Sequence, residues 1–210
     1  VISLALFMFL PIRIGSFFRR FTNSSFLIAL IEGVIKMAVF ITYISAISLM
    51  KDIRRTYMYH GAEHKCINCI EHGLPLTTAN VRISSKEHKR CGTSFLLLVI
   101  VVSILVSMFI TISTVWLRSL VRLALLPVVV GLSYEFIRLA GSSNNPVVCV
   151  LSKPGLWLQG LTTRQPDDDM IEVAIRAVEE VFDCKAYQLR EFGRTADYAG
   201  VDEDDKAAEL

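Results

Sequence analysis

The sequence lacks internal repeats, and it lacks low-complexity segments apart from an acidic stretch at its end, which excludes a repeat architecture. Its net charge of +2 says little by itself. We expect no nucleic-acid partner. No cleavable signal sequence, with a basic start and a small-residue cleavage site, can be recognised. The first residue is Val1 rather than Met, so we expect the chain to be a fragment whose upstream part is missing.

Long apolar runs determine the predicted fold class, because 53% of the residues are hydrophobic. Residues 26–50 and 94–117 are each long enough to cross a hydrocarbon core of roughly 30 Å, which needs about 20 helical residues. A third run covers residues 120–140, and residues 1–14 have the composition of the remainder of a further span. We therefore predict an all-α, polytopic membrane protein with about four transmembrane helices.

Basic residues predict the orientation, because short loops rich in Lys and Arg stay on the cytoplasmic side. A smaller group follows the first span, and eight basic residues lie between the second and third spans: Lys51, Arg54, Arg55, Lys65, Arg82, Lys86, Lys89 and Arg90. We expect a multi-pass protein of the cytoplasmic membrane, with this loop and both visible ends in the cytoplasm. Thiols stay reduced there, so the five cysteines favour metal or redox roles over a disulfide framework.

The expected domain boundaries follow from these runs. Residues 1–50 hold the first two spans, 51–93 a cytoplasmic His/Cys loop domain, 94–141 the last two spans, 142–195 an interfacial segment with an amphipathic helix, and 196–210 an acidic tail. Residues 142–146 should break the fourth span. Pro166 and Asp167 should open the amphipathic helix, whose apolar residues recur at helical spacing, and we expect it to pack against the loop domain.

Histidine is scarce and concentrated, since all four histidines and three of the five cysteines fall within residues 60–91. Imidazole and thiolate are the side chains that bind zinc best, so this crowding predicts a divalent metal site, with Zn²⁺ as the expected ion. On an α-helix His60 and His64 lie one turn apart on the same face, with Glu63 beside them. The order His-x-x-Glu-His is that of inverted zincins, in which the glutamate takes a proton from metal-bound water.

A second pair of candidate ligands, His88 and Cys91, lies directly before the third span at a spacing that allows chelation on a helical turn. If all four residues bind, the site is closed and structural. If one of them only supports another ligand, a water position opens and catalysis becomes possible. The sequence leaves both alternatives open, with Glu63 as the expected catalytic residue.

Three further residues of the loop are weaker candidates. Cys66 and Cys69 form a C-x-x-C, but the helical period turns both away from the two histidines, so we expect them against the membrane-facing side, with Cys69 a reserve ligand. His72 precedes Gly73 near the expected end of the helix, where the dipole favours a histidine without any metal.

Charged residues also occur inside the predicted spans. Glu32 and Lys36 are an i,i+4 pair, either a structural pair between helices or part of a polar path. Glu135 is a reserve metal ligand because inverted zincins take a distant glutamate, although pairing with Arg138 at i,i+3 is the preferred interpretation.

Several separate runs of the sequence resemble one bacterial membrane family, the YqhQ-like proteins that carry the domain of unknown function 1385. The runs are Tyr-His-Gly-Ala-Glu-His-Lys at 59–65, Asn-Val-Arg at 80–82, His-x-x-Cys-Gly-Thr-Ser-Phe at 88–95, and further stretches at 49–55, 134–141, 154–159 and 161–167. The resemblance implies a metal-dependent membrane enzyme with His60, Glu63, His64, His88 and Cys91 as its functional set, and Cys69 also matches. Cys66 departs from the pattern, where we expect Thr, and the glycine-rich segment typical of the family is absent.

Three functions remain open at this point. The first is an integral membrane zinc-dependent hydrolase, a peptidase by analogy, in which Glu63 is the general base. The second is a non-enzymatic assembly or scaffold protein that binds other membrane proteins and uses a structural zinc site. The third is an ion transporter or channel that uses the intramembrane charges.

Overall fold

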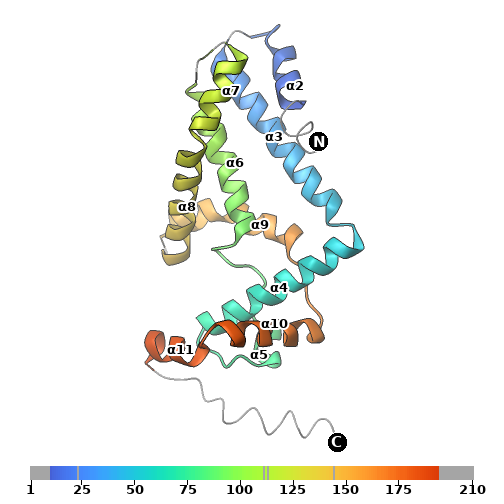
Figure 1. The fold of residues 1–210 in the computed structure, drawn as a ribbon, viewed down its shortest axis with the longest axis vertical. Coiled ribbons are helices and arrows are strands. Elements are labelled where there is room, and N and C mark those ends of the chain that lie inside the picture. The colour runs from blue at the N-terminus through green and yellow to red at the C-terminus, as the bar shows by residue number, and fades with distance from the viewer. Residues whose placement is uncertain (1–9, 23, 111, 113, 144, 194–210) are drawn as a thin grey trace, which may run out of the picture. The chain divides into compact units, whose positions relative to one another are not determined.

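The computed structural model describes residues 10–22, 24–110, 112, 114–143 and 145–193, and every regular element in these ranges is an α-helix, which confirms the all-α prediction. The helices in chain order are α2 Leu10–Phe18, α3 Ser25–Ile47, α4 Lys51–Glu71, α5 Thr78–Ile83, α6 Gly92–Met108, α7 Val115–Ala124, α8 Leu126–Ser142, α9 Pro146–Thr162, α10 Asp168–Val181 and α11 Cys184–Phe192 (Figure 1). The predicted acidic tail and most of the predicted span 1–14 lie outside the described residues.

The chain divides into two compact units. The apolar unit comprises the described residues up to Ile47 together with Lys89–Gln159, and the histidine unit comprises Ser48–His88 together with the described residues from Gly160 onward. In the apolar unit α3 packs on α2 and α6, and α8 packs on α6 and α7. In the histidine unit α4 packs on α5, α10 and α11.

The helix α3 agrees with the predicted second span. It has 23 residues with a mean hydropathy of 2.1, and among the described helices it alone is long and apolar enough on its own to cross a membrane. The pair α7 and α8 passes the same test as one bent segment, and α6 is apolar but shorter, with 17 residues. By length and composition, the described helices therefore offer one or two candidate spans.

Two of the predicted apolar runs have different ends in the structure. The prediction of one span over residues 94–117 was wrong in extent, because α6 ends at Met108. The next residues are mostly β-branched or hydroxyl-bearing, which are weaker helix formers. The run 120–140 is divided between α7 and α8, with a bend of 42°. Pro127 accounts for the break, because proline lacks an N–H and disfavours helical backbone in the preceding residue.

The segment after the fourth predicted span is more helical than expected. The break at 142–146 is confirmed, since α8 ends at Ser142 and α9 begins at Pro146. However, α9 then continues to Thr162 with Pro154 inside it, where we expected an irregular interfacial segment. The side chain of Gln159 donates from Nε2 to Ser94 Oγ over 2.6 Å, which fixes the end of α9 to the start of α6 within the apolar unit.

The histidine unit has its own core, in which the amphipathic helix α10 packs against α4 and α5 (Figure 1). As predicted, α10 begins after Asp167, which is its N-cap residue. Its Ile171 is fully buried, and Arg82 of α5 pairs with Asp168 over 2.6 Å at the surface. The core contains Ala62, Cys66, Cys69, Ile70, Leu76, Val81, Ile171 and Cys184. Cys66 and Cys69 therefore pack inside this unit, which corrects the expectation that they face the membrane.

Candidate metal centre

The helix α4 presents two histidines on one face, as the i,i+4 spacing predicts. The imidazole centroids of His60 and His64 lie 4.4 Å apart, and the rings meet edge to face. His64 is 3% exposed and His60 is half-buried. The helix ends at Glu71 with His72 as its C-cap, and the next residue, Gly73, takes the left-handed φ of +70° that favours glycine.

Both imidazoles are oriented by backbone carbonyls of the same unit. His60 Nδ1 donates to the carbonyl oxygen of Thr162 over 2.9 Å, and His64 Nδ1 donates to that of Lys86 over 2.7 Å. A carbonyl oxygen only accepts, so Nδ1 carries the proton in each ring and the lone pair is on Nε2. A metal-binding histidine usually has this arrangement, in which the second nitrogen donates to a carbonyl or carboxylate.

A close approach of two backbones makes the first of these bonds possible. Gly61 lies against the backbone of Arg164, and a Cβ atom at this position would overlap the Arg164 carbonyl oxygen. The amide of Arg164 donates to the Tyr57 carbonyl oxygen over 2.9 Å, so the segment is bonded to α4 on both sides of the contact. Glycine at 61 therefore allows the Thr162 carbonyl to reach His60.

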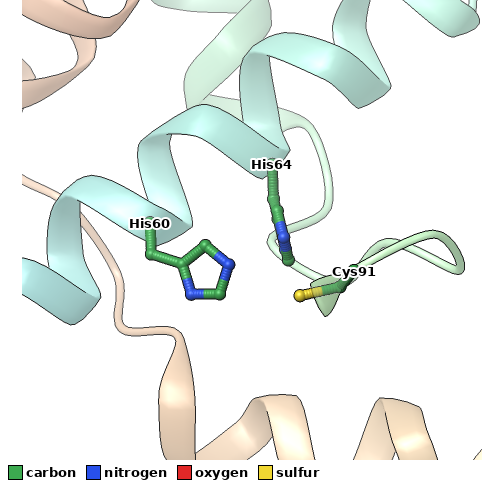
Figure 2. A group of neighbouring side chains, drawn as sticks. All are labelled: His60, His64 and Cys91. Atoms are coloured by element: carbon green, nitrogen blue, oxygen red, sulfur yellow. The ribbon is translucent and has the colours of Figure 1, made fainter. Parts of the chain in front are cut away.

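Cys91 supplies a third candidate ligand atom. His60, His64 and Cys91 each offer one ligand atom, and these atoms all lie within 4.8 Å of one another, with the thiol turned toward the two rings (Figure 2). Only two residues separate Cys91 from His88 of the histidine unit, so the chain alone keeps their Cα atoms within about 11 Å. Cys91 is also the N-cap of α6, where the helix dipole favours an anionic group.

The spacing of these atoms is close to that of a zinc site. Bond lengths of about 2.0 Å to nitrogen and 2.3 Å to sulfur place the ligand atoms of a tetrahedral zinc roughly 3.3–3.6 Å apart. Ligand atoms within 4.8 Å of one another therefore need to move together by only about 1 Å. Rotation about the χ angles of these side chains can supply such a movement.

His88, the fourth predicted ligand, lies beside this group but is not a member of it. Its ring centroid is 5.9 Å from that of His64, and its Nε2 donates to Glu71 Oε2 over 3.1 Å. Residues 88–91 form a turn before α6 rather than the helical turn that we expected. Sequence reasoning also missed Glu71, which lies seven residues after His64 and therefore within about 20° of the same helix face.

The loop that carries His88 is held against α4 by two buried polar side chains. Lys65 Nζ donates to the carbonyl oxygens of Arg82 and Ser84 over 2.9 and 2.6 Å. Asn68 Nδ2 donates to those of Ser85 and Glu87 over 2.8 and 2.9 Å. Burial, and then the nearby positive charge of Lys86, hold the pKa of Lys65 below its ordinary value. The loop is therefore positioned by α4 itself.

The two cysteines of the C-x-x-C are poorly suited to bind a metal. Both are fully buried in the core of the histidine unit, and this burial raises the pKa of Cys66 to about 12 and that of Cys69 to about 11. Cys69 Sγ also lies 3.2 Å from the Pro75 carbonyl oxygen, to which it can donate. Because the thiolate is the form that binds zinc, these environments disfavour ligation.

The remaining predicted residues lie outside the group of three. Glu63 is exposed on α4, and its role as a base stays a prediction. His72 is exposed at the C-cap, and its Nδ1 donates to the Asn68 carbonyl oxygen over 2.6 Å. Glu135 and Arg138 form an ion pair of 3.5 Å with both side chains exposed, which confirms the preferred prediction that these two residues pair.

Glu32 has partners that the sequence analysis did not identify. Its pairing with Lys36 stays a prediction, and in addition its carboxylate lies 3.5 Å from Arg118 Nη2 and 3.1 Å from Arg122 Nη2, both on α7. Lys36 lines a small cavity beside it. One signal was present in the sequence, since Arg118 and Arg122 repeat the i,i+4 spacing of Glu32 and Lys36 within another apolar segment.

Comparison with known proteins gives one family. The profile of the family described as "Protein of unknown function (DUF1385)" matches residues 1–184. Over 157 residues the chain is 43% identical to "Uncharacterized protein YqhQ" of Bacillus subtilis (strain 168), an alignment that covers 74% of this chain and 49% of that protein. The chain thus spans about half the length of this curated relative. No solved structure matches the chain.

Proposed function

Since the chain belongs to the DUF1385 family, which is described as a protein family of unknown function, we propose a function from the chemistry of its own residues. The protein binds one divalent metal ion through His60 and His64 of α4 and the thiolate of Cys91. Two imidazoles and a thiolate form a ligand set that suits Zn²⁺ better than harder ions such as Mg²⁺ or Ca²⁺.

One observation carries this proposal. The two histidines of α4 both direct Nδ1 to a backbone carbonyl, from Thr162 and from Lys86, so both have the lone pair on Nε2. Core histidines have no general need for the same tautomer on neighbouring turns of one helix. Shared orientation of adjacent imidazoles is what a metal centre requires.

We further propose that the metal centre is catalytic. Catalytic zinc sites have three protein ligands and a fourth position for water, and three ligand atoms gather here. A zinc-bound water has its pKa lowered to about 7 and can attack a carbonyl or phosphoryl centre. With the ion bound, Glu63 would serve as the base that accepts a proton from that water, and a peptide bond is the first substrate class to test.

A structural zinc site is the second candidate, and the position of His88 favours it. The ring of His88 is buried and 5.9 Å from that of His64, which makes it the nearest candidate for a fourth ligand if its contact with Glu71 is released. Four protein ligands would close the site and leave no position for water. The protein would then be a non-enzymatic membrane scaffold.

Cobalt substitution distinguishes these two sites. In the purified full chain loaded with Co²⁺, an open site should bind azide and change its visible absorption spectrum, whereas a closed site should not respond. We expect the wild-type protein to respond to azide, because its fourth position is open. The same spectral change on azide addition is expected for His72→Ala, since His72 is exposed at the end of α4 and outside the group of three.

Two other results would contradict parts of this proposal. Azide sensitivity that appears only in His88→Ala would identify His88 as the fourth ligand and exclude the open site. Failure of the wild-type protein to bind Co²⁺ or Zn²⁺ would exclude the metal centre itself.

With an open site, Glu63→Gln should keep its metal content and lose hydrolysis of a fluorogenic peptide library, because only the general base is removed.

We also propose that the apolar unit is embedded in the cytoplasmic membrane, with α3 and the bent pair α7 and α8 as spans. The support is the length and hydropathy of these helices and the large apolar side chains that they expose, among them Val34, Leu120 and Leu132. The protein should stay in the membrane pellet after an alkaline carbonate wash. Its release into the supernatant would contradict an integral position.

A further inference from the structure

A buried charged group lies within the apolar unit, and it consists of other residues than the metal centre. Glu32 of α3 is 2% exposed, and both of its carboxylate oxygens face arginines of α7: Oε1 lies 3.5 Å from Arg118 Nη2, and Oε2 lies 3.1 Å from Arg122 Nη2. The helix α2 closes the other side, because a Cβ at Gly15 would stand 2.7 Å from Glu32 Cγ. The carboxylate is thus enclosed by three helices.

A cavity of about 230 Å³ adjoins this group, between α3, α6 and the residues from Arg122 to Leu126. Its polar lining consists of Glu32, Lys36, Ser103, Ser107 and Arg122, and the remaining lining residues are apolar or glycine. The Nε atom of Arg122 is buried and has no hydrogen-bond partner within the described part of the chain. The cavity therefore has one cationic N–H group that Glu32 does not satisfy.

The charges around the cavity do not balance. Three basic side chains are near it, Lys36 and Arg122 in the lining and Arg118 beside Glu32, whereas Glu32 is the one carboxylate of the group. Glu32 and Glu135 are the two acidic residues in segments 1–47 and 89–159, and Glu135 is exposed and paired with Arg138. The unit itself has no second carboxylate for this group. Unbalanced charge is unfavourable in an apolar surrounding, so the group favours a bound anion.

We propose that this cavity binds a phosphate oxyanion, either inorganic phosphate or the phosphate of an anionic phospholipid headgroup. Arg122 Nε and Lys36 Nζ are the cationic donors, and the hydroxyls of Ser103 and Ser107 are the neutral donors. These donors come from three helices, which suits an anion with oxygens in several directions. The excess of basic side chains disfavours a metal cation, and 230 Å³ is large enough for a phosphate group.

The test is a calorimetric titration. Inorganic phosphate is added to the purified, delipidated full chain in a neutral detergent, and the heat of binding is measured. We expect saturable binding that is weakened at least tenfold by Arg122→Gln and by Lys36→Met, because each removes a cationic donor. Glu32→Gln should instead strengthen binding, since it removes the competing carboxylate at nearly constant shape. Arg138→Gln is the matched control, because Arg138 is an exposed arginine of the same unit that does not line the cavity.

A second arm identifies the source of the phosphate. Phosphatidylglycerol and phosphatidylcholine are each added in mixed micelles, and displacement of radiolabelled phosphate is measured. Displacement by phosphatidylglycerol alone assigns the site to an anionic lipid headgroup, and displacement by neither lipid assigns it to free phosphate. The proposal is overturned if neither phosphate nor phosphatidylglycerol binds saturably, or if Arg138→Gln weakens binding as much as Lys36→Met. If Arg122→Gln fails to fold, the opposite signs expected for Lys36→Met and Glu32→Gln decide the matter.

Discussion

Replacing His64 with alanine should lower the affinity of the protein for Zn²⁺ by roughly two to three powers of ten. Apparent binding free energies of structural zinc sites are about 10–16 kcal/mol, which is roughly 2.5–4 kcal/mol for each of four ligands. His64 is the more buried of the two α4 histidines, and its orientation is fixed by the Lys86 carbonyl oxygen. Competition with a chromophoric chelator measures the change directly.

His72→Ala is the matched control for this experiment. His72 lies on the same helix, but it is exposed at the C-cap and bonded to the Asn68 carbonyl oxygen. Its removal should change the zinc affinity by less than about twofold, because it leaves the three candidate ligands in place. Equal losses of zinc affinity in both variants would show that a general disturbance of α4, rather than the removal of a specific imidazole, weakens zinc binding. An unchanged affinity in His64→Ala would remove His64 from the ligand set.

The features of the metal centre that depend on residues close together in the sequence could be predicted. An i,i+4 pair on a helix shares one face whatever the rest of the chain does, so His60 and His64 were placed correctly relative to each other. The same argument applies to α10, whose apolar spacing and N-terminal Asp167 predicted both its start and its buried face. These features depend on helical periodicity alone.

The contacts between residues far apart in the sequence could not be predicted. The carbonyl groups of Thr162 and Lys86 orient the imidazoles, but every residue has a carbonyl group, so no residue type marks the partner. Arg118 and Arg122 meet Glu32 across about ninety positions of chain, and single-sequence periodicity contains no information about such pairing. The end of α6 at Met108 and the break between α7 and α8 beside Pro127 depend on local propensities that an average hydropathy conceals.

Gly61→Ala should destabilise the histidine unit and weaken zinc binding together. Alanine at a helix position is favoured over glycine by about 1 kcal/mol, so helix propensity alone predicts a gain in stability. Packing predicts the opposite, because the new Cβ would overlap the backbone carbonyl oxygen of Arg164, and a backbone group cannot rotate away as a side chain can. Overpacking costs about 1–3 kcal/mol, and overlap with a backbone atom calls for the upper end of this range. After the gain of about 1 kcal/mol from helix propensity is subtracted, we expect a net loss of about 2 kcal/mol in the free energy of unfolding.

The same displacement should reach the metal centre. The segment that must move includes Thr162, whose carbonyl oxygen accepts from His60 Nδ1, and loss of such an orienting bond typically costs 10–100-fold in metal affinity. Gly160→Ala is the control, since a Cβ there meets nothing within 4 Å and should leave both quantities unchanged or raise stability slightly. Urea unfolding and zinc competition are measured on both variants. A Gly61→Ala protein as stable as Gly160→Ala would mean that α4 and residues 162–164 are not in close contact.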